Sequence, residues 1–263
     1  MESAETLKES PFFVFLSYLR SIVATPLAAI WTLTYGSVAI VTLLLFPSNR
    51  IRDVIFHTWG KGLCTLFGLD IEVRGLENFP KPGTPGGVCL FNHSSNFDIP
   101  IINSAIFGSI RWGAKVELFK IPIFGPTLKS MGVLPIARAN REEVLKVYEQ
   151  SIPRVKKGEC FALAPEGTRK DGTKIYPFKT GPFVFATQAQ CPLIPIVVHG
   201  AWRVQSKGQV FACWGRWNNK VIIEVLPQIS TQGYDLERRP ELQDKAYHVM
   251  SETFERLCRE NGR

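Results

Sequence analysis

The sequence predicts an α/β fold in which a largely parallel, mixed sheet is flanked by helices. Short apolar segments typical of strands recur near residues 88, 133, 160 and 193, and helical patterns separate them. Strands that alternate with helices usually lie parallel in one sheet, because each helix returns the chain to the same edge. Functional residues in such sheets collect in the loops after the strand ends. A functional site is therefore expected in those loops.

The N-terminal part, residues 1–68, is predicted to be a hydrophobic helical membrane segment. No charged residue lies between Arg20 and Arg50, and about 20 apolar residues are enough to cross a bilayer as a helix. Acidic residues precede the run and no small-residue cleavage site follows it, which excludes a signal peptide. A second stretch, residues 55–67, places apolar side chains every three or four positions, which is typical of an amphipathic helix.

The mode of membrane attachment stays open at this point. The first segment would span the bilayer with the second at its surface, or both would dip into one leaflet, or both are ordinary buried helices. Basic residues are slightly more numerous after the apolar run than before it. That bias favours a cytoplasmic location for the part of the chain that follows the apolar run.

Residues 69–263 are predicted to form the α/β domain. The strands expected from apolar runs and alternation are 70–74, 88–91, 111–115, 133–136, 160–163, 193–198 and 221–226. The helices expected from periodicity are 99–106, one that begins at Asn140, 181–189, and a closing helix around 242–257. Asn140 is predicted to cap its helix, with Glu143 reaching back.

Charge and cysteine content narrow the class of protein. The chain carries a net charge of +8, and because residues 1–49 carry −1, the remainder carries +9. A basic body suits a membrane surface, a phosphorylated substrate or a nucleic acid. Nucleic acid is the least favoured partner, because the basic residues do not form a recognisable binding module. The six cysteines show no Cys-x2-Cys spacing, so we expect reduced thiols, with neither zinc nor disulfides.

The most informative pattern lies in residues 89–98, where His93 follows an apolar strand and Asp98 comes five residues later. A histidine whose second ring nitrogen is held by a carboxylate can remove a proton from an alcohol near neutral pH. The other three histidines have no aspartate at this offset. His93 and Asp98 are therefore the candidate catalytic pair. The alternative, a loop histidine beside a helix-capping aspartate, stays open.

A second polar group, residues 165–169, also follows an apolar strand. Gly167 allows a ligand to approach the backbone closely, and Thr168 offers a hydroxyl. Arg169 offers donors that match phosphate oxygens. Glu166 is expected to accept a hydrogen bond from a substrate hydroxyl or to hold Arg169.

Two more basic residues lie near predicted strand ends, Lys115 and Arg138. Taken singly, each is most often a surface charge. Together with Arg169 they would make a cationic pocket beside His93. The candidate substrate-binding residues are Lys115, Arg138, Glu166, Gly167, Thr168 and Arg169.

The chain resembles the lysophosphatidic acid acyltransferase family of glycerophospholipid acyltransferases over about residues 69–225. Four sequence blocks, in the family's order, carry the resemblance: Asn92-His93 with Asp98, Gly132-Val133 with Ile136 and Arg138, Pro165 to Arg169, and Ile194 to Val197. The four together are much more specific than any one of them. The resemblance implies a glycerol-3-phosphate acyltransferase-like α/β fold.

The resemblance also implies a reaction. A fatty acyl group would pass from acyl-CoA or acyl-carrier protein to the free sn-2 hydroxyl of lysophosphatidic acid. His93 would take the hydroxyl proton, Asp98 would orient the imidazole, and Arg169 would grip the acceptor phosphate, with Lys115 and Arg138 as additional candidates. The implied partners are membrane lipids and the two substrates, without a cofactor or a metal. The oxyanion stabiliser is not identifiable from the sequence.

Three alternatives remain. The acceptor could instead be another lysophospholipid, glycerol-3-phosphate or a lyso-aminolipid. A hydrolase is disfavoured, because no Gly-x-Ser-x-Gly pattern is present and a phosphate site would lack a purpose. A non-enzymatic membrane lipid-binding protein fits the apolar helices and the basic body equally well, but it has no need of an oriented base.

Overall fold

A computed structural model describes residues 10–137 and 139–262. Its centre is a seven-stranded sheet of strand order β1-β7-β6-β2-β5-β3-β4. The strands are β1 (Leu69–Arg74), β2 (Val88–Phe91), β3 (Ile110–Lys115), β4 (Leu134–Ile136), β5 (Cys160–Leu163), β6 (Leu193–His199) and β7 (Asn219–Val225). All neighbouring pairs are parallel except β6 and β7. The predicted α/β fold with a largely parallel sheet is confirmed.

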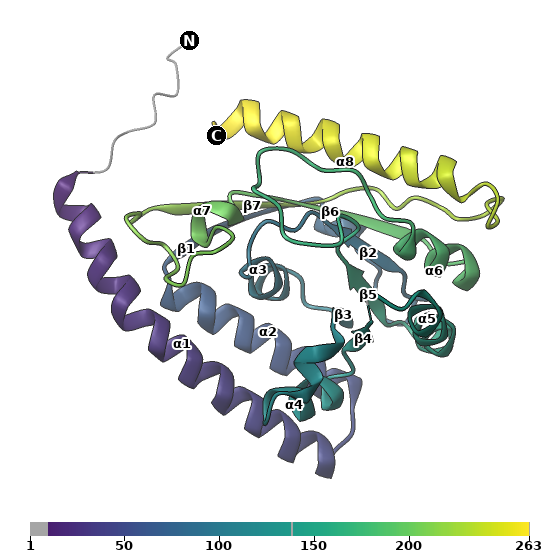
Figure 1. Cartoon of the computed structure of the whole chain (residues 1–263), viewed down its shortest axis with the longest axis horizontal. Helices are drawn as coiled ribbons and strands as arrows, with labels where there is room; N and C mark the ends of the chain where they lie inside the picture. Colours follow the sequence, from purple (N-terminus) through teal and green to yellow (C-terminus); the bar gives the residue numbers. More distant parts are fainter. Residues whose placement is uncertain (1–9, 138, 263) are drawn as a thin grey trace.

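The helices form a layer on each side of the sheet (Figure 1). One layer contains α5 (Arg141–Lys156), α6 (Gly181–Ala189) and α8 (Arg239–Asn261). The other contains α2 (Asn49–Leu66) and α3 (Asp98–Ala105), with α1 (Pro11–Leu45) and α4 (Phe124–Ser130) outside them. Three short elements complete the chain: η1 (Leu76–Asn78), η2 (Val116–Lys120) and α7 (Ala201–Val204).

The cap of α5 follows the sequence prediction in part. Asn140 Oδ1 accepts the backbone N–H of Glu143 at 3.3 Å, as expected. The Glu143 carboxylate does not reach the backbone, however, because its Oε1 accepts from the Asn140 side-chain amide at 2.8 Å. In the predicted capping box Glu143 would accept from the backbone N–H of Asn140, whereas here it accepts from the side chain of Asn140.

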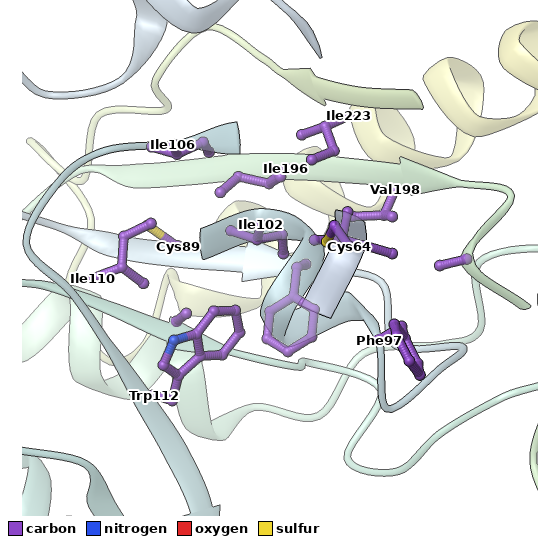
Figure 2. Packing of buried hydrophobic residues seen from close by; sticks show 14 of the residues in the cluster. Cys64, Cys89, Phe97, Ile102, Ile106, Ile110, Trp112, Ile196, Val198 and Ile223 are labelled. Atoms are coloured by element: carbon purple, nitrogen blue, oxygen red, sulfur yellow. The ribbon is translucent and has the colours of Figure 1, made fainter. Parts of the chain in front are cut away.

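The core between α2, α3 and the sheet joins the N-terminal helices to the rest of the chain. Figure 2 shows Ile102 of α3 among the apolar side chains of the sheet, with Cys64 of α2 in the same cluster. The α1 helix contributes Ala24, Ala39 and Leu43 to this core. Residues 10–68 and the sheet domain thus bury apolar surface against each other, which is the main favourable contribution to folding.

Buried charges also tie α2 to the sheet. The guanidinium of Arg111, on β3, is fully buried and lies 2.7 Å from the Asp53 carboxylate of α2. Asp53 also accepts from the hydroxyl of Ser109 at 2.7 Å. Glu159 lies 3.8 Å from the same guanidinium and pairs with Arg154 of α5 at 2.6 Å. The sequence predicts Arg111 in a strand but carries no signal for these partners.

The α1 helix is longer than the charge-free window suggests, since it begins at Pro11 and spans 35 residues, about 52 Å at 1.5 Å per residue. By length and composition it is the one candidate membrane span among the described residues. An outward stripe of exposed apolar side chains runs along it: Phe12, Phe15, Leu19, Ile22, Val23, Leu27, Ile30, Leu33, Val38, Val41, Leu44 and Leu45. This surface is typical of contact with lipid.

Candidate active site

The site begins where the central strand β2 ends. Asn92 is buried, and its side-chain amide forms two hydrogen bonds to the backbone of Val198 on β6, each of 2.8 Å. These bonds continue the pairing of β2 with β6 beyond Phe91, its last paired residue. The start of the following loop is therefore fixed to the sheet. In the sequence, Asn92 stands out only as part of the motif with His93, and its amide next to the histidine is the one signal of this role.

His93 and Asp98 form a hydrogen bond, with Nδ1 and Oδ2 separated by 2.8 Å. The same Asp98 oxygen accepts the backbone N–H groups of Ser94 and Ser95, each at 2.9 Å. Asp98 is buried, whereas the His93 side chain is 16% exposed. The carboxylate makes Nδ1 the donor nitrogen, so Nε2 is left as the proton acceptor.

The arrangement differs from a helix cap. Asp98 is the first residue of α3, and its side chain accepts from residues that precede the helix. A capping aspartate instead accepts from the first N–H groups inside the helix. The Asp98 carboxylate therefore orients the loop and the imidazole. The alternative of a loop histidine beside a helix-capping aspartate does not describe these contacts.

Glu166 joins the second polar group to the histidine. Its buried carboxylate accepts the backbone N–H of His93 at Oε2 and that of Tyr176 at Oε1, both at 2.9 Å. The backbone N–H of Lys170 in turn donates to the His93 carbonyl at 2.8 Å. Burial raises the pKa of Glu166, although the two backbone N–H groups oppose the shift. Both carboxylate oxygens thus hold the backbone, and neither holds Arg169, which was one of the two roles expected from the sequence.

The rest of this turn surrounds the histidine loop. Gly167 has φ +76°, and a Cβ there would lie 3.3 Å from the Lys179 side chain, so the position favours glycine. Thr168 is exposed. Arg169 is half-buried, and its guanidinium has no hydrogen-bond or ion-pair partner among the described residues. A donor group without a protein partner is available to a ligand.

Lys115 and Arg138, the other two candidate substrate-binding residues, have no described contact with His93 or Asp98. Lys115 ends β3 with its side chain 53% exposed, and its ammonium lies 3.3 Å from the Glu117 carboxylate. This is the geometry of a surface ion pair. Arg138 lies outside the described residues. Within residues 10–137 and 139–262, no cluster of three His, Cys, Asp or Glu side chains has a metal-binding arrangement.

An apolar cavity of about 170 Å³ lies close to the pair, enclosed by α1, α2, β3 and α4. Its walls include Ile99, the residue after Asp98, and Trp112. The ring of Trp112 lies edge-on to Phe91 at 5.3 Å, and Phe91 lies 5.5 Å from the His93 ring. A chain of aromatic contacts therefore links the cavity to the imidazole. The sequence does not predict this cavity, because its walls come from segments far apart in the chain.

Comparison with known proteins agrees with the geometry. The family model described as Acyltransferase matches residues 70–199. The chain is 28% identical over 245 residues to 1-acyl-sn-glycerol-3-phosphate acyltransferase of Escherichia coli, covering 92% of this chain and 95% of that protein. It is 32% identical over 139 residues to the chloroplastic 1-acyl-sn-glycerol-3-phosphate acyltransferase of Brassica napus, a match that covers 52% of this chain and 39% of the plant protein.

A solved structure supports the fold. The chain superposes on the 1-acyl-sn-glycerophosphate (LPA) acyltransferase PlsC of Thermotoga maritima with a TM-score of 0.76 and 24% identity, over 93% of this chain and 97% of that one. The family model, the relatives and the fold agree with the resemblance noted in the sequence. The chain belongs to the lysophosphatidic acid acyltransferase family and is an O-acyltransferase.

Proposed function

We propose that the chain transfers a fatty acyl group from acyl-CoA or acyl-carrier protein to the free sn-2 hydroxyl of lysophosphatidic acid, giving phosphatidic acid. The observation that carries the proposal is the partly exposed imidazole of His93, held by the buried Asp98 at 2.8 Å and fastened through its own peptide to Glu166 and Lys170. The names of the relatives, 1-acyl-sn-glycerol-3-phosphate acyltransferases, support this choice of acceptor.

The chemistry needs one base. Nε2 of His93 takes the proton of the acceptor hydroxyl while the hydroxyl oxygen bonds to the thioester carbonyl carbon. Asp98 stabilises the imidazolium that forms. The carbonyl then re-forms, the carbon–sulfur bond breaks, and the thiolate leaves with the proton from His93. The acyl group moves directly to the acceptor oxygen, without an acyl-enzyme.

Arg169 is the proposed ligand of the acceptor phosphate. Its guanidinium is half-buried and has no partner among the described residues, and its planar donors match phosphate oxygens in pairs. Gly167 and Thr168 shape the same turn. Lys115 and Arg138 remain additional proposed contacts to the phosphate or to the donor.

The apolar cavity beside Trp112 is proposed to receive the acyl chain of the donor. Its walls are almost entirely apolar, and it approaches His93 through Trp112 and Phe91. An acyl chain in this cavity would place its thioester near the imidazole. Such positioning supplies much of the rate enhancement in a two-substrate reaction.

The membrane attachment is proposed to be parallel to the bilayer rather than across it. Contacts to the rest of the chain run along α1, from Phe13 beside Trp217 to Gly36 against Thr127. A helix packed on its domain over this length cannot cross the hydrocarbon core without drawing the domain into it. The outward apolar stripe would lie in one leaflet, with the site on the cytoplasmic surface.

Purified protein incubated with acyl-CoA and lysophosphatidic acid tests the proposal, with the lipid product identified by mass spectrometry. We expect phosphatidic acid and one free thiol for each acyl group transferred. A parallel panel of glycerol-3-phosphate, lysophosphatidylcholine and a lyso-aminolipid separates the acceptors. Transfer to one of these, and not to lysophosphatidic acid, would contradict the proposed acceptor while leaving the acyl-transfer mechanism in place.

A further inference from the structure

Residues 205–218, between α7 and β7, form a segment that exposes large apolar side chains. We name it the aromatic segment. Val210 is 72% exposed, Phe211 37% and Trp214 42%, while Ala212 and Cys213 between them are buried. Exposing three large apolar groups together is unfavourable in water. This surface therefore indicates contact with something apolar.

The aromatic segment is held in a defined shape. The backbone N–H of Cys213 donates to the Val204 carbonyl at 2.6 Å, and Gln205 Nε2 donates to the carbonyls of Gln209 and Val210. The rings of Phe211 and Trp214 stack at 5.0 Å. The apolar side chains are thus directed outward by a structured backbone.

The segment lies against the N-terminal half of α1, as the hydrogen bonds between them show. Ser21 Oγ donates to the Ala212 carbonyl at 2.7 Å. The Arg20 guanidinium donates to the carbonyls of Arg216 and Trp217 at 2.8 and 2.9 Å. The ring of Tyr18 lies 4.7 Å from that of Trp214. These contacts place the segment beside the N-terminal half of α1 (Figure 1), the helix that carries the exposed apolar stripe.

Basic side chains flank the apolar ones. Lys207 and Arg216 are exposed, and neither has an acidic partner within the described residues. Tryptophan together with lysine and arginine is typical of the headgroup layer of a membrane, where ring and ammonium groups meet phosphates above the acyl chains. The charge and the apolar surface both suit a phospholipid bilayer.

The segment is also connected to the loop that carries the base. Asn96, between His93 and Asp98, donates from its side-chain amide to Gln205 Oε1 at 3.1 Å. An open groove of about 570 Å³ lies between α1, this loop and the segment, and Asn96, Gln205 and Val210 contribute to its walls. An element that fixes the segment at the bilayer would fix this groove there too.

We propose that the aromatic segment is a second membrane-binding element, which inserts Val210, Phe211 and Trp214 at the boundary between headgroups and acyl chains of a phospholipid bilayer. The inference rests on the proposed attachment of α1 to one leaflet. The axis of α1 and the tip of the aromatic segment, which follows Ser21 of α1 by 191 residues at Ala212, would both touch the bilayer. A line and a point outside it define a plane, so the two contacts together would set the orientation of the active site relative to the lipid surface.

The full-length protein, bound to vesicles of brominated phosphatidylcholine with anionic phosphatidylglycerol, tests the inference through quenching of tryptophan fluorescence. Trp214→Phe should reduce the quenched part of the emission. Adding Val210→Trp to that variant should restore it, because the new ring would lie in the same layer. Adding Leu236→Trp is the matched control, since Leu236 is 45% exposed in the connection that precedes α8, on the other side of the sheet.

Flotation of the same vesicles separates the two proposals. If the protein floats but Val210→Trp is quenched no more than Leu236→Trp, the segment does not enter the bilayer, while the attachment of α1 stands. If the protein does not float, both the attachment and the insertion are wrong. A third outcome would also overturn the inference: the protein forms dimers, Trp214→Ser dissociates them, and tryptophans at positions 210 and 214 are not quenched. The segment would then bind a second copy of the chain.

Discussion

The carboxylate of Glu166 holds the peptide N–H of His93 at 2.9 Å, so the turn after β5 fixes the residue that begins the loop after β2. Its other oxygen holds Tyr176 at the same distance. Glu166 is a positioning residue in this arrangement. Its influence on acyl transfer should come through the geometry of His93 rather than through contact with substrate.

Replacing Glu166 should lower turnover more than it weakens substrate binding. Glu166→Ala leaves two partly buried N–H groups without their acceptor, and each lost bond to a charged acceptor costs about 1.5–3 kcal/mol. Glu166→Gln keeps one acceptor oxygen and should have a smaller effect. We expect kcat to fall at least about tenfold in the alanine variant, with little change in the Michaelis constant for lysophosphatidic acid. A raised Michaelis constant with an unchanged kcat would indicate direct substrate contact instead.

His93→Ala should abolish acyl transfer and leave the fold intact. General base catalysis contributes about 10²–10⁴-fold, so the residual rate should be reduced by at least that range. Asp98→Asn should also lower kcat strongly, because the amide cannot stabilise the imidazolium. Steady-state rates of purified variants check this, with circular dichroism to confirm folding. Near wild-type transfer by His93→Ala would reject its role.

Arg169→Ala should weaken binding of the acceptor. A hydrogen bond to a charged group contributes about 1.5–3 kcal/mol, so the Michaelis constant for lysophosphatidic acid should rise about tenfold or more. Lys115→Ala should raise the constant less, because the ammonium of Lys115 is largely exposed and already paired with Glu117, and exposed pairs of this kind are worth about 0–1 kcal/mol. If Arg169→Ala and Lys115→Ala raise the Michaelis constant equally, Arg169 is not the principal ligand of the acceptor phosphate.

Filling the apolar cavity should change the preferred acyl chain. Leu128, on α4, lines the cavity. Leu128→Trp should shift the ratio of kcat/KM toward shorter acyl-CoA donors, by about tenfold for a change of one or two methylene groups. Leu128→Ala should shift it toward longer donors. Rates with a series of donors from eight to eighteen carbons check this, and an unchanged profile in both variants would place the acyl chain elsewhere.

His199 should make the folded state less stable in acid. Burial, with Arg203 nearby, lowers the pKa of His199 to about 4 from its ordinary 6.5. The unfolded chain therefore binds a proton at this residue between pH 6.5 and about 4 while the folded chain does not, and stability falls as the pH decreases through that window. The loss is about 1.4 kcal/mol per pH unit at most.

His199→Phe isolates this contribution. Phenylalanine keeps an aromatic ring next to Trp202 and Phe254 but cannot be protonated. The free energy of unfolding from denaturant titrations should depend less steeply on pH in the variant between pH 6.5 and about 4. Parallel curves for the two proteins would show that His199 does not titrate in this way.

The sheet could be predicted well because its strands are short apolar runs between turns, and each observed strand begins within two residues of the expected position. The start of α1 could not be predicted, because the expected apolar helix was defined by the charge-free window after Arg20, whereas α1 begins at Pro11. Arg20 lies inside that helix, and its guanidinium reaches two carbonyls almost 200 residues away. A charge satisfied at such a distance leaves no local signal.

The polar residues of the candidate site were predictable as types, but their partners were not. His93 and Asp98 are five residues apart, and the short spacing made their hydrogen bond a reasonable expectation. Glu166 binds backbone groups, one of them 73 residues away, and any residue type supplies a backbone N–H. The apolar cavity likewise depends on helices and strands far apart in the chain that meet in space.

The ion pair between Arg111 and Asp53 has a practical consequence for work with the protein. A fragment without residues 1–68 would lose the Asp53 carboxylate at 2.7 Å and keep Glu159, at 3.8 Å, as the remaining acidic neighbour of the Arg111 guanidinium. Removing one partner of a buried ion pair costs about 3–5 kcal/mol, a large part of the roughly 5–15 kcal/mol that holds a typical domain folded. Trimming the hydrophobic helices should therefore destabilise the α/β domain, which favours handling the enzyme as the full chain in detergent or lipid nanodiscs.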